Sequence, residues 1–304
     1  MISFVPMLAD HLGVKDQGLL EKDIRLHRLL RDLTRDPTLR THLAFKGGTC
    51  LIKCYLNYPR FSTDLDFTWI DLGSRERGGQ GTKAFRRAVR PTQRRLESSL
   101  RTLAEAQGYR TDRSDLFQYG RSNRLMTVNL RSPGPVGSNG LVKVQLDFEE
   151  TLLFPTVPAE AHSLVATALP PKFRLLHSDL ADSYATAVPL TAYDPREILV
   201  EKCRAILTRT APKSRDLVDL FLLEHERGLR VEDFTSMIKE KTRHAVKGSA
   251  RYREQAARFD EREALLLEED VTPLLLRPID SEGFERHRRR VVRFLRKLLP
   301  EVLA

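Results

Sequence analysis

Two short motifs in the first quarter of the chain carry residue types that could bind a nucleotide. A Gly-Gly-Thr sequence occupies positions 47–49, and an Asp-Leu-Asp sequence follows about 16 residues later, at positions 64–66. Glycine lets the backbone approach a ligand closely, and the free N–H groups of a helix opened by Thr49 would attract a triphosphate. Taken alone, the glycine motif also fits a plain turn before a helix.

The Asp-Leu-Asp sequence has the spacing of a metal site. Side chains two positions apart on a β-strand point to the same face, so Asp64 and Asp66 would project together. Two adjacent carboxylates repel each other unless a cation lies between them. Magnesium suits such a site, because substrate phosphates and water complete its coordination. A lone match also fits a solvated strand edge, but the nearby glycine motif favours a nucleotide with its metal.

A third carboxylate lies in the segment LVKVQLDF at 141–148, where apolar and polar residues alternate. One face of this expected strand is apolar, and the other carries Asp147. Asp147 could join Asp64 and Asp66 around the metals, or act as the base for an attacking hydroxyl. An outer strand with a solvated polar face explains the pattern equally well.

Lys202, in the second half of the chain, is a charged residue where the helix pattern calls for an apolar one. Its neighbours three and four positions away are all apolar, so it lies within the apolar stripe of the expected helix. A buried lysine needs an anionic partner, although a lysine can also extend to the edge of its helix. Asp216 and Asp219 in the next expected helix could supply that partner, and helix capping alone would also explain Asp216. The functional interpretation of Lys202 is a phosphate ligand.

The elements that must position these residues divide the chain into two parts. The first part is expected to contain helices at 16–35, just after the glycine motif, and at 91–107, with strands near 42–46, 64–70, 124–130 and 141–148. Later in the chain only helices are expected, at 178–187, 195–209, 214–226, 231–245, 252–268 and 280–299. We therefore predict an α+β fold with a mixed α/β core at 1–160 and a mainly helical lobe at 161–304.

The charge of the chain favours a polyanionic partner such as nucleic acid. Its 51 Lys and Arg residues exceed its 41 Asp and Glu residues, which gives a formal net charge of +10. The expected helix at 280–299 surrounds an apolar stripe with basic side chains, a surface that suits RNA phosphates or solvent equally well. An arginine-rich composition alone would give the same net charge.

Cysteine usage and hydropathy indicate an ordinary intracellular protein. Cys50, Cys54 and Cys203 lack a paired zinc spacing, so we expect small buried hydrophobic side chains. Every apolar run is shorter than the roughly 20 residues that span a bilayer. The N-terminal apolar run contains Asp10 and has no basic segment before it. We therefore expect a cytoplasmic protein without a secretory signal.

Four segments occur in an order that resembles a known family. FKGGTCLIKCY, RFSTDLDF, REILVEKCRAIL and SRDLVDL together are similar to the AbiEii/AbiGii nucleotidyltransferase-like toxins of type IV toxin–antitoxin systems, which include the mycobacterial MenT toxins. The resemblance spans roughly residues 43–224, and the last 80 or so residues add nothing to it. It implies a polymerase-β-like nucleotidyltransferase core followed by a helical lobe.

The resemblance also implies roles for individual residues. Gly48 and Thr49 would hold nucleotide phosphates, Ser62 occupies the position of a common family serine, and Lys202 and Asp216 would be contributed to the cleft by the helical lobe. With the candidates above, the full set is Gly47, Gly48, Thr49, Lys53 and Ser62 for the nucleotide, Asp64, Asp66 and Asp147 for the metal, and Asp64, Asp66, Lys202 and Asp216 for catalysis.

The activity that the resemblance implies is transfer of a nucleoside monophosphate from an NTP, often a pyrimidine, to the 3′ acceptor end of tRNA. Such transfer blocks aminoacylation and translation. It would use magnesium, expected as a two-metal site, and the toxin would be paired with a cognate antitoxin encoded nearby. The alternatives are a nucleotidyltransferase with a protein or small-molecule acceptor, and a non-catalytic protein that binds RNA or a partner.

Overall fold

The computed structural model describes residues 3–70, 81–132, 140–165, 169–211, 213–268, 271–272 and 275–304. The chain forms two compact units. The first, which we call the sheet unit, contains Met1–Thr151 and Thr156–Tyr193. The second, the helical unit, contains Leu152–Pro155 and Asp194–Ala304.

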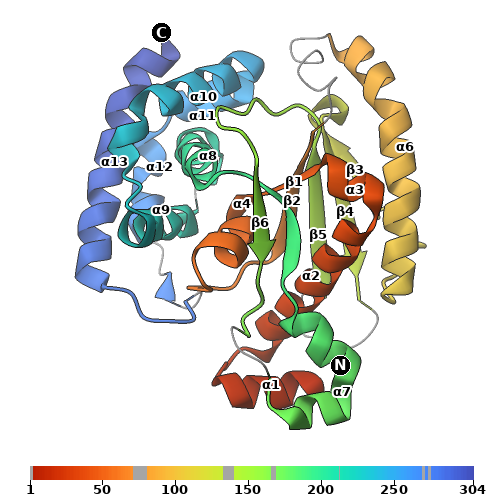
Figure 1. Ribbon diagram of the computed structural model, residues 1–304. Coiled ribbons are helices and arrows are strands. Elements are labelled where there is room, and N and C mark those ends of the chain that lie inside the picture. The colour runs from red at the N-terminus through yellow and green to blue at the C-terminus, as the bar shows by residue number, and fades with distance from the viewer. Residues whose placement is uncertain are drawn as a thin grey trace. The chain divides into compact units, whose positions relative to one another are not determined.

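A mixed seven-stranded sheet forms the centre of the sheet unit, in the order β3-β4-β5-β2-β1-β7-β6 (Figure 1). Strand β1 pairs antiparallel with β2 and parallel with β7, and β2 pairs parallel with β5. The strands are β1 Leu43–Lys46, β2 Asp64–Trp69, β3 Phe117–Gly120, β4 Leu125–Arg131, β5 Leu141–Asp147, β6 Val157–Ala161 and β7 Val188–Ala192. The predicted α+β class is confirmed.

Alternation of apolar and polar residues explains the two central strands. In β2, Leu65 and Phe67 are buried, whereas Asp64 and Asp66 are partly exposed on the opposite face. Strand β5 likewise buries Val142, Val144 and Leu146 and leaves Lys143 exposed. Both strands therefore turn one apolar face to the core, as the sequence predicts, and on their polar faces Thr68 and Asp147 are buried as well.

Helices flank this sheet. They are α1 Phe4–Leu12, α2 Gln17–Arg35, α3 Pro37–His42, α4 Gly47–Cys50, the π-helix η1 Leu51–Tyr55, α6 Thr82–Ala106, the short 3-10 turn η2 Arg121–Asn123 and α7 Pro171–Ala185. Helix α6 runs along the β3–β4 side of the sheet (Figure 1). It begins nine residues before the expected start at Pro91, because Phe85 and Val89 already bury their side chains. Two further segments lie mostly outside the described residues: 71–83, where a polar, glycine-rich sequence predicts a loop, and 131–140, where Pro and Gly residues predict a hairpin connection.

Helix α8 lies at the centre of the helical unit and packs against α9, α10, α11 and α13 (Figure 1). The helices are α8 Pro195–Thr208, α9 Ser214–Arg227, η3 Val231–Phe234, α10 Thr235–Gly248, α11 Ala250–Ala257, α12 Asp260–Glu268 and α13 Ser281–Leu303. The backbone N–H groups of Leu153 and Phe154 donate to Glu197 of α8, at 2.8 and 2.9 Å. These bonds explain why the short segment 152–155 belongs to the helical unit.

The units meet in the chain at residues 193 and 194, later than the expected boundary at 160. The difference arises because β6, α7 and β7 belong to the sheet unit, where β7 pairs with β1. The 178–187 helix expected for the helical lobe corresponds to α7 of the sheet unit.

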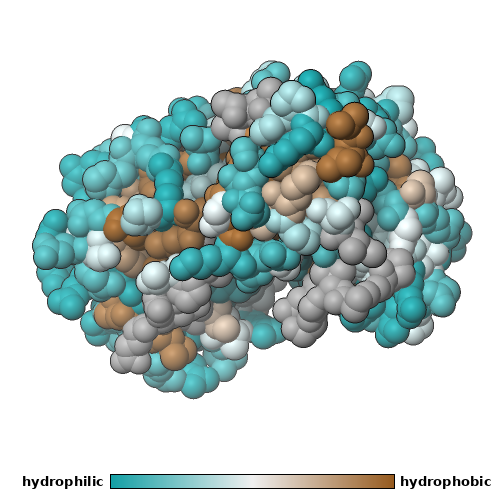
Figure 2. All heavy atoms as spheres, turned by 90° about the horizontal axis from the view of Figure 1, so that it is seen from below, coloured by the Kyte–Doolittle hydropathy of each residue, from teal (hydrophilic) through white to brown (hydrophobic). Residues whose placement is uncertain are grey.

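Most apolar side chains, including those of two of the three cysteines, are buried rather than exposed at the surface. On the face shown in Figure 2 most residues are hydrophilic, and apolar residues gather in separate small areas. Of the helices in the described ranges, none combines the length and the apolar character needed to span a bilayer. Cys50 and Cys203 are fully buried and Cys54 is partly buried, all as free thiols. Burial raises the pKa of the Cys50 and Cys203 thiols.

Candidate active site

The glycine turn touches the second carboxylate of the Asp-Leu-Asp motif. Strand β1 ends at Lys46, whose Cα is paired with that of Asp66 in β2, and Gly47 follows with a φ of 75°. A Cβ atom at Gly47 would lie 2.6 Å from Asp66 Oδ2. Both the left-handed conformation and this close approach require glycine here. The structure therefore joins the two motifs at the start of α4.

The two aspartates lie on a polar strip of the sheet. Asp64 and Asp66 are partly exposed, and the register places Lys143 of β5 beside Asp64 and Lys46 of β1 beside Asp66. Lys46 Nζ lies 3.3 Å from Glu150 Oε2. The strip thus combines carboxylates that could bind a cation with lysines that could bind phosphate.

Thr49 and Ser62 connect the glycine turn to the carboxylate strand. Thr49 is buried, and its hydroxyl lies 2.7 Å from Ser62 Oγ and hydrogen-bonds to the backbone carbonyl of Asp64. One hydroxyl has a single proton to donate, so Thr49 and Ser62 form a shared chain of hydrogen bonds that ends at β2. Thr49 is therefore placed to position the strand, and Ser62 is the more exposed hydroxyl of the pair.

Lys22 of α2 also acts on Asp64, an interaction that no pattern in the sequence indicates. Burial lowers the pKa of the Lys22 ammonium, and the attraction of Asp64 opposes that effect. Lys143 lowers the Lys22 pKa further by repulsion. Two lysines thus share the electrostatic environment of Asp64. Lys22 was missed because it lies in a helix whose pattern indicates only packing.

Asp147 lies on the same strip but has other partners. In the register of β2 and β5 it stands beside Thr68, two residue pairs beyond Asp66. Its carboxylate accepts hydrogen bonds from Arg121 Nη1 at 2.6 Å and from the Glu149 N–H at 3.0 Å, and burial raises the Asp147 pKa. Within the described ranges, no group of three or more His, Cys, Asp or Glu residues could hold a metal ion. The structure thus does not bring Asp147 into a metal site with Asp64 and Asp66.

Lys53 points into the core of the sheet unit. Its ammonium lies 2.9 Å from Asp23 Oδ1 of α2 and hydrogen-bonds to the Tyr58 hydroxyl, and all three residues are buried. Tyr184 donates to the same carboxylate, at 2.6 Å. This placement does not support the nucleotide-binding role expected for Lys53. Its charge compensates a buried aspartate instead.

In the helical unit, Lys202 is enclosed by carboxylates. Its Nζ lies 2.9 Å from Asp216 Oδ1 and 2.6 Å from Asp219 Oδ2, so both pairings considered from the sequence are present. The side chains of all three residues are buried. Helices α8 and α9 are therefore joined through a charged cluster rather than through apolar contacts alone.

Arg209 completes this cluster and was not anticipated. Its Nη1 lies 2.5 Å from Asp216 Oδ2. Burial alone would raise the pKa of Asp216, but the charges of Lys202 and Arg209 outweigh it and hold that pKa well below its usual range. Arg209 follows the last residue of α8, a position that the sequence marks only as a helix end.

Comparisons with known proteins extend the resemblance found in the sequence. The family model described as "Nucleotidyl transferase AbiEii toxin, Type IV TA system" matches residues 28–303, and so includes the C-terminal segment that the four motifs leave out. Among curated proteins no significant match is found. Among solved structures, the nucleotidyltransferase toxin MenT4 from Mycobacterium tuberculosis H37Rv is similar over 99% of this chain and 93% of its own, with a TM-score of 0.56 and 20% sequence identity.

The likeness to MenT4 shows that the two proteins share a fold. The family model goes further, because it spans nearly the whole described chain and includes the glycine turn, both aspartates and the Lys202 cluster. The protein therefore belongs to the AbiEii family of nucleotidyltransferase toxins of type IV toxin–antitoxin systems.

Proposed function

We propose that this nucleotidyltransferase transfers a nucleoside monophosphate from an NTP to the 3′ end of tRNA, with Mg²⁺ bound by Asp64 and Asp66. Enzymes of this family use an NTP and a divalent metal ion. The observation that carries the proposal is the contact of Gly47 with Asp66, because it brings a backbone turn suited to phosphates against a carboxylate suited to the metal.

The two carboxylates fit magnesium better than a metal that needs a complete protein cage. Mg²⁺ commonly takes one or two carboxylates and completes its shell with water and substrate phosphates. Asp64 and Asp66 are partly exposed, which leaves room for those ligands. When bound, the metal would neutralise the triphosphate and align it with the attacking hydroxyl.

The other residues of the sheet unit would bind and orient the nucleotide. Backbone N–H groups of Gly47 and Gly48, at the first turn of α4, would donate to phosphate oxygens. Thr49 would hold β2 in place through its bond to Asp64, and Ser62 would contact the nucleotide beside it.

We propose that Lys202 stabilises negative charge on the phosphates during transfer. Asp216 and Asp219 would fix its position and keep it protonated, since neighbouring carboxylates favour the charged ammonium. In this account Asp216 is a positioning residue.

Transfer RNA is the proposed acceptor because the chain is basic and the family is one of toxins. A pyrimidine NTP is the proposed donor. Membership of a nucleotidyltransferase family favours catalysis over RNA binding alone, and it implies a cognate antitoxin. A protein or a small hydroxylated molecule remains the competing acceptor.

The test is transfer of label from each α-³²P NTP to total bacterial tRNA, total protein and small hydroxylated acceptors in parallel. Wild type should label tRNA with one NTP in the presence of Mg²⁺, and Asp64→Ala should not. Chelation of the metal should abolish the label, and added Mg²⁺ should restore it. Label only on protein or on a small acceptor would overturn the choice of tRNA, and label that survives in Asp64→Ala would overturn the assignment of the metal site.

A further inference from the structure

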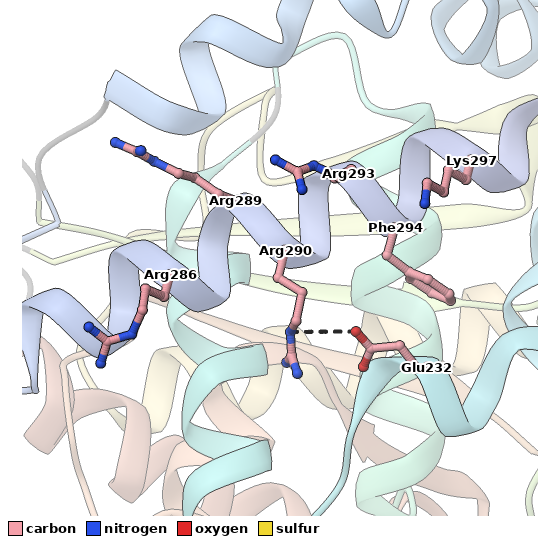
Figure 3. Close-up of a pocket in the computed structure, with 7 residues that line it drawn as sticks. All are labelled: Glu232, Arg286, Arg289, Arg290, Arg293, Phe294 and Lys297. Atoms are coloured by element: carbon pink, nitrogen blue, oxygen red, sulfur yellow. Dashed lines mark ion pairs between the residues drawn. The ribbon is translucent and has the colours of Figure 1, made fainter.

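Helix α13 borders a basic pocket within the helical unit. The helix buries Phe284, Val291 and Leu295 against its neighbours. Beside this apolar stripe lies a pocket of about 440 Å³, drawn in Figure 3. The residues that line it are Glu232, Arg286, Arg289, Arg290, Arg293, Phe294 and Lys297. Five of these seven side chains are cationic.

The basic side chains of α13 differ in whether they form an ion pair with an acidic side chain. Arg288 lies 2.9 Å from Glu285, and Arg296 lies 2.8 Å from Asp260. By contrast, the pocket residues Arg289, Arg293 and Lys297 form no ion pair with a side chain of the described ranges, and the acid that lines the same pocket, Glu232, pairs with Arg290. Folding alone does not account for these three positive charges.

Arg289, Arg293 and Lys297 also repel one another. They are spaced four residues apart, so they form one row along the helix that extends about 12 Å. Like charges at this spacing destabilise a helix. A row of cations at each helical turn is suited to a polymer that carries regularly spaced negative charges.

Two further lining residues differ from this row: Arg290 is ion-paired, and Phe294 carries an aromatic ring. Arg290 lies 3.4 Å from Glu232 and is hydrogen-bonded to Glu224, so its charge is compensated and its position is set. Phe294 is partly exposed beside these groups. Figure 3 shows Arg290 and Phe294 extending toward Glu232, with Arg289 and Arg293 at the opposite edge of the helix. The lining of the pocket thus combines a partly exposed aromatic ring with cationic side chains from the same helix.

We propose that this pocket binds RNA, with Arg289, Arg293 and Lys297 on successive phosphates and Phe294 stacked on a base. Aromatic stacking beside a positively charged groove is a common way to hold a nucleic acid strand. An acidic protein segment could pair with the cations, but it would make no special use of a partly exposed ring in the same pocket. The choice of RNA rests on the proposed function. The pocket itself is an additional site on the helical unit.

The first experiment measures binding of 5′-labelled total bacterial tRNA to the full chain without NTP, by fluorescence anisotropy at several salt concentrations. The test variant carries Arg289→Gln, Arg293→Gln and Lys297→Gln. Each lost phosphate contact should make the plot of log K against log salt shallower by about 0.7–0.9, so the variant should lose about two to three units of slope. At 0.1 M salt its affinity should fall by roughly tenfold to a hundredfold.

The matched control replaces one lysine and two arginines that are exposed on α6 of the sheet unit: Lys83→Gln, Arg87→Gln and Arg94→Gln. Both triple variants change the net charge equally. Equal losses of affinity would overturn the proposal, because they would show a general effect of charge. An unchanged slope in the α13 variant would overturn it as well. Its Tm should stay the same or rise, since a repulsive row has been removed.

A second variant tests the stacking. Phe294→Leu keeps an apolar side chain and should weaken tRNA binding by roughly fivefold to a hundredfold without changing the salt slope. Phe294→Trp should restore the affinity. Wild-type affinity in Phe294→Leu would refute the stacking.

Two outcomes separate this proposal from the proposed function. If transfer to tRNA occurs but neutralising the row leaves binding unchanged, only the pocket assignment fails. If no acceptor RNA is labelled but the row and Phe294 both govern tRNA binding, the pocket assignment stands and the choice of acceptor fails. Competition by poly-L-glutamate as strong as that by unlabelled tRNA would assign the pocket to an acidic protein segment instead.

Discussion

Substitution of Gly47 by alanine should disturb the candidate metal site through one contact. Alanine in the left-handed region costs about 1–2 kcal/mol relative to glycine. Its Cβ would also lie 2.6 Å from Asp66 Oδ2. Moving the Asp66 side chain off its rotamer adds about 0.5–1.5 kcal/mol. The variant should therefore unfold with a free energy lower by about 2–3 kcal/mol, or a Tm lower by roughly 4–12 °C for a unit of this size.

The effect on transfer should exceed the effect on stability. A displacement of about 1 Å in a group that positions the substrate can cost roughly a hundredfold in rate. Gly108→Ala is the matched control, because Gly108 has a φ of 77° and no described atom lies within 4 Å of its Cβ position. Gly108→Ala should lose only the stability that alanine costs in the left-handed region, about 1–2 kcal/mol, and should keep its transfer activity.

Nucleotide transfer measured as pyrophosphate release, together with thermal unfolding, tests this prediction. In the double variant Gly47→Ala/Asp66→Ala the part of the stability loss that comes from the clash should disappear, since the opposing carboxylate is gone. If Gly47→Ala transfers nucleotide at the rate of Gly108→Ala, the contact between the glycine turn and Asp66 does not set the geometry of the reaction.

Three further predictions follow from the contacts in each unit. Asp147→Asn should retain Mg²⁺-dependent transfer in an assay of rate against metal concentration, because an arginine and a backbone N–H already occupy its carboxylate, whereas Asp66→Asn should lose transfer. Lys202→Met should lower the free energy of unfolding in urea by about 3–5 kcal/mol, because Asp216 and its neighbour would lose their buried partner. Burial lowers the pKa of His27 to about 4. Stability linked to neutral His27 should thus be complete above pH 6.5 or so and fall by up to about 3 kcal/mol toward pH 4. His27→Gln should flatten the dependence of Tm on pH in that window.

Local patterns were sufficient to predict the elements that carry the site. Alternation at 64–69 and 141–147 identified β2 and β5 and the face on which Asp64 projects. Apolar periodicity placed α8, α9 and α13 to within a few residues. In each case the signal lies within one element, because burial on one face is enough to produce it.

Features that depend on distant parts of the chain were not predictable in this way. Strand β7 contains Pro189 in a short segment, and its place in the sheet depends on pairing with β1, about 145 residues earlier. Lys53 was expected to bind the nucleotide together with the residues of the glycine motif. Its partner Asp23 comes from another helix, and no pattern in either segment indicates the pair. The same limit explains why Lys22 was missed.

The two charged clusters differ in a way that assigns them different roles. In the helical unit, each carboxylate around Lys202 is buried and neutralised by a cation within 3 Å. A metal ion there would have to displace a lysine or an arginine, whose charges already hold the pKa of Asp216 well below its usual range. In the sheet unit, Asp64 and Asp66 are partly exposed beside a backbone turn that admits no side chain. A divalent ion gains most where carboxylates are close together and still accessible. This difference favours the proposed metal site at Asp64 and Asp66 over one at the Lys202 cluster, and in the proposal Lys202 acts as a cation whose position is already fixed.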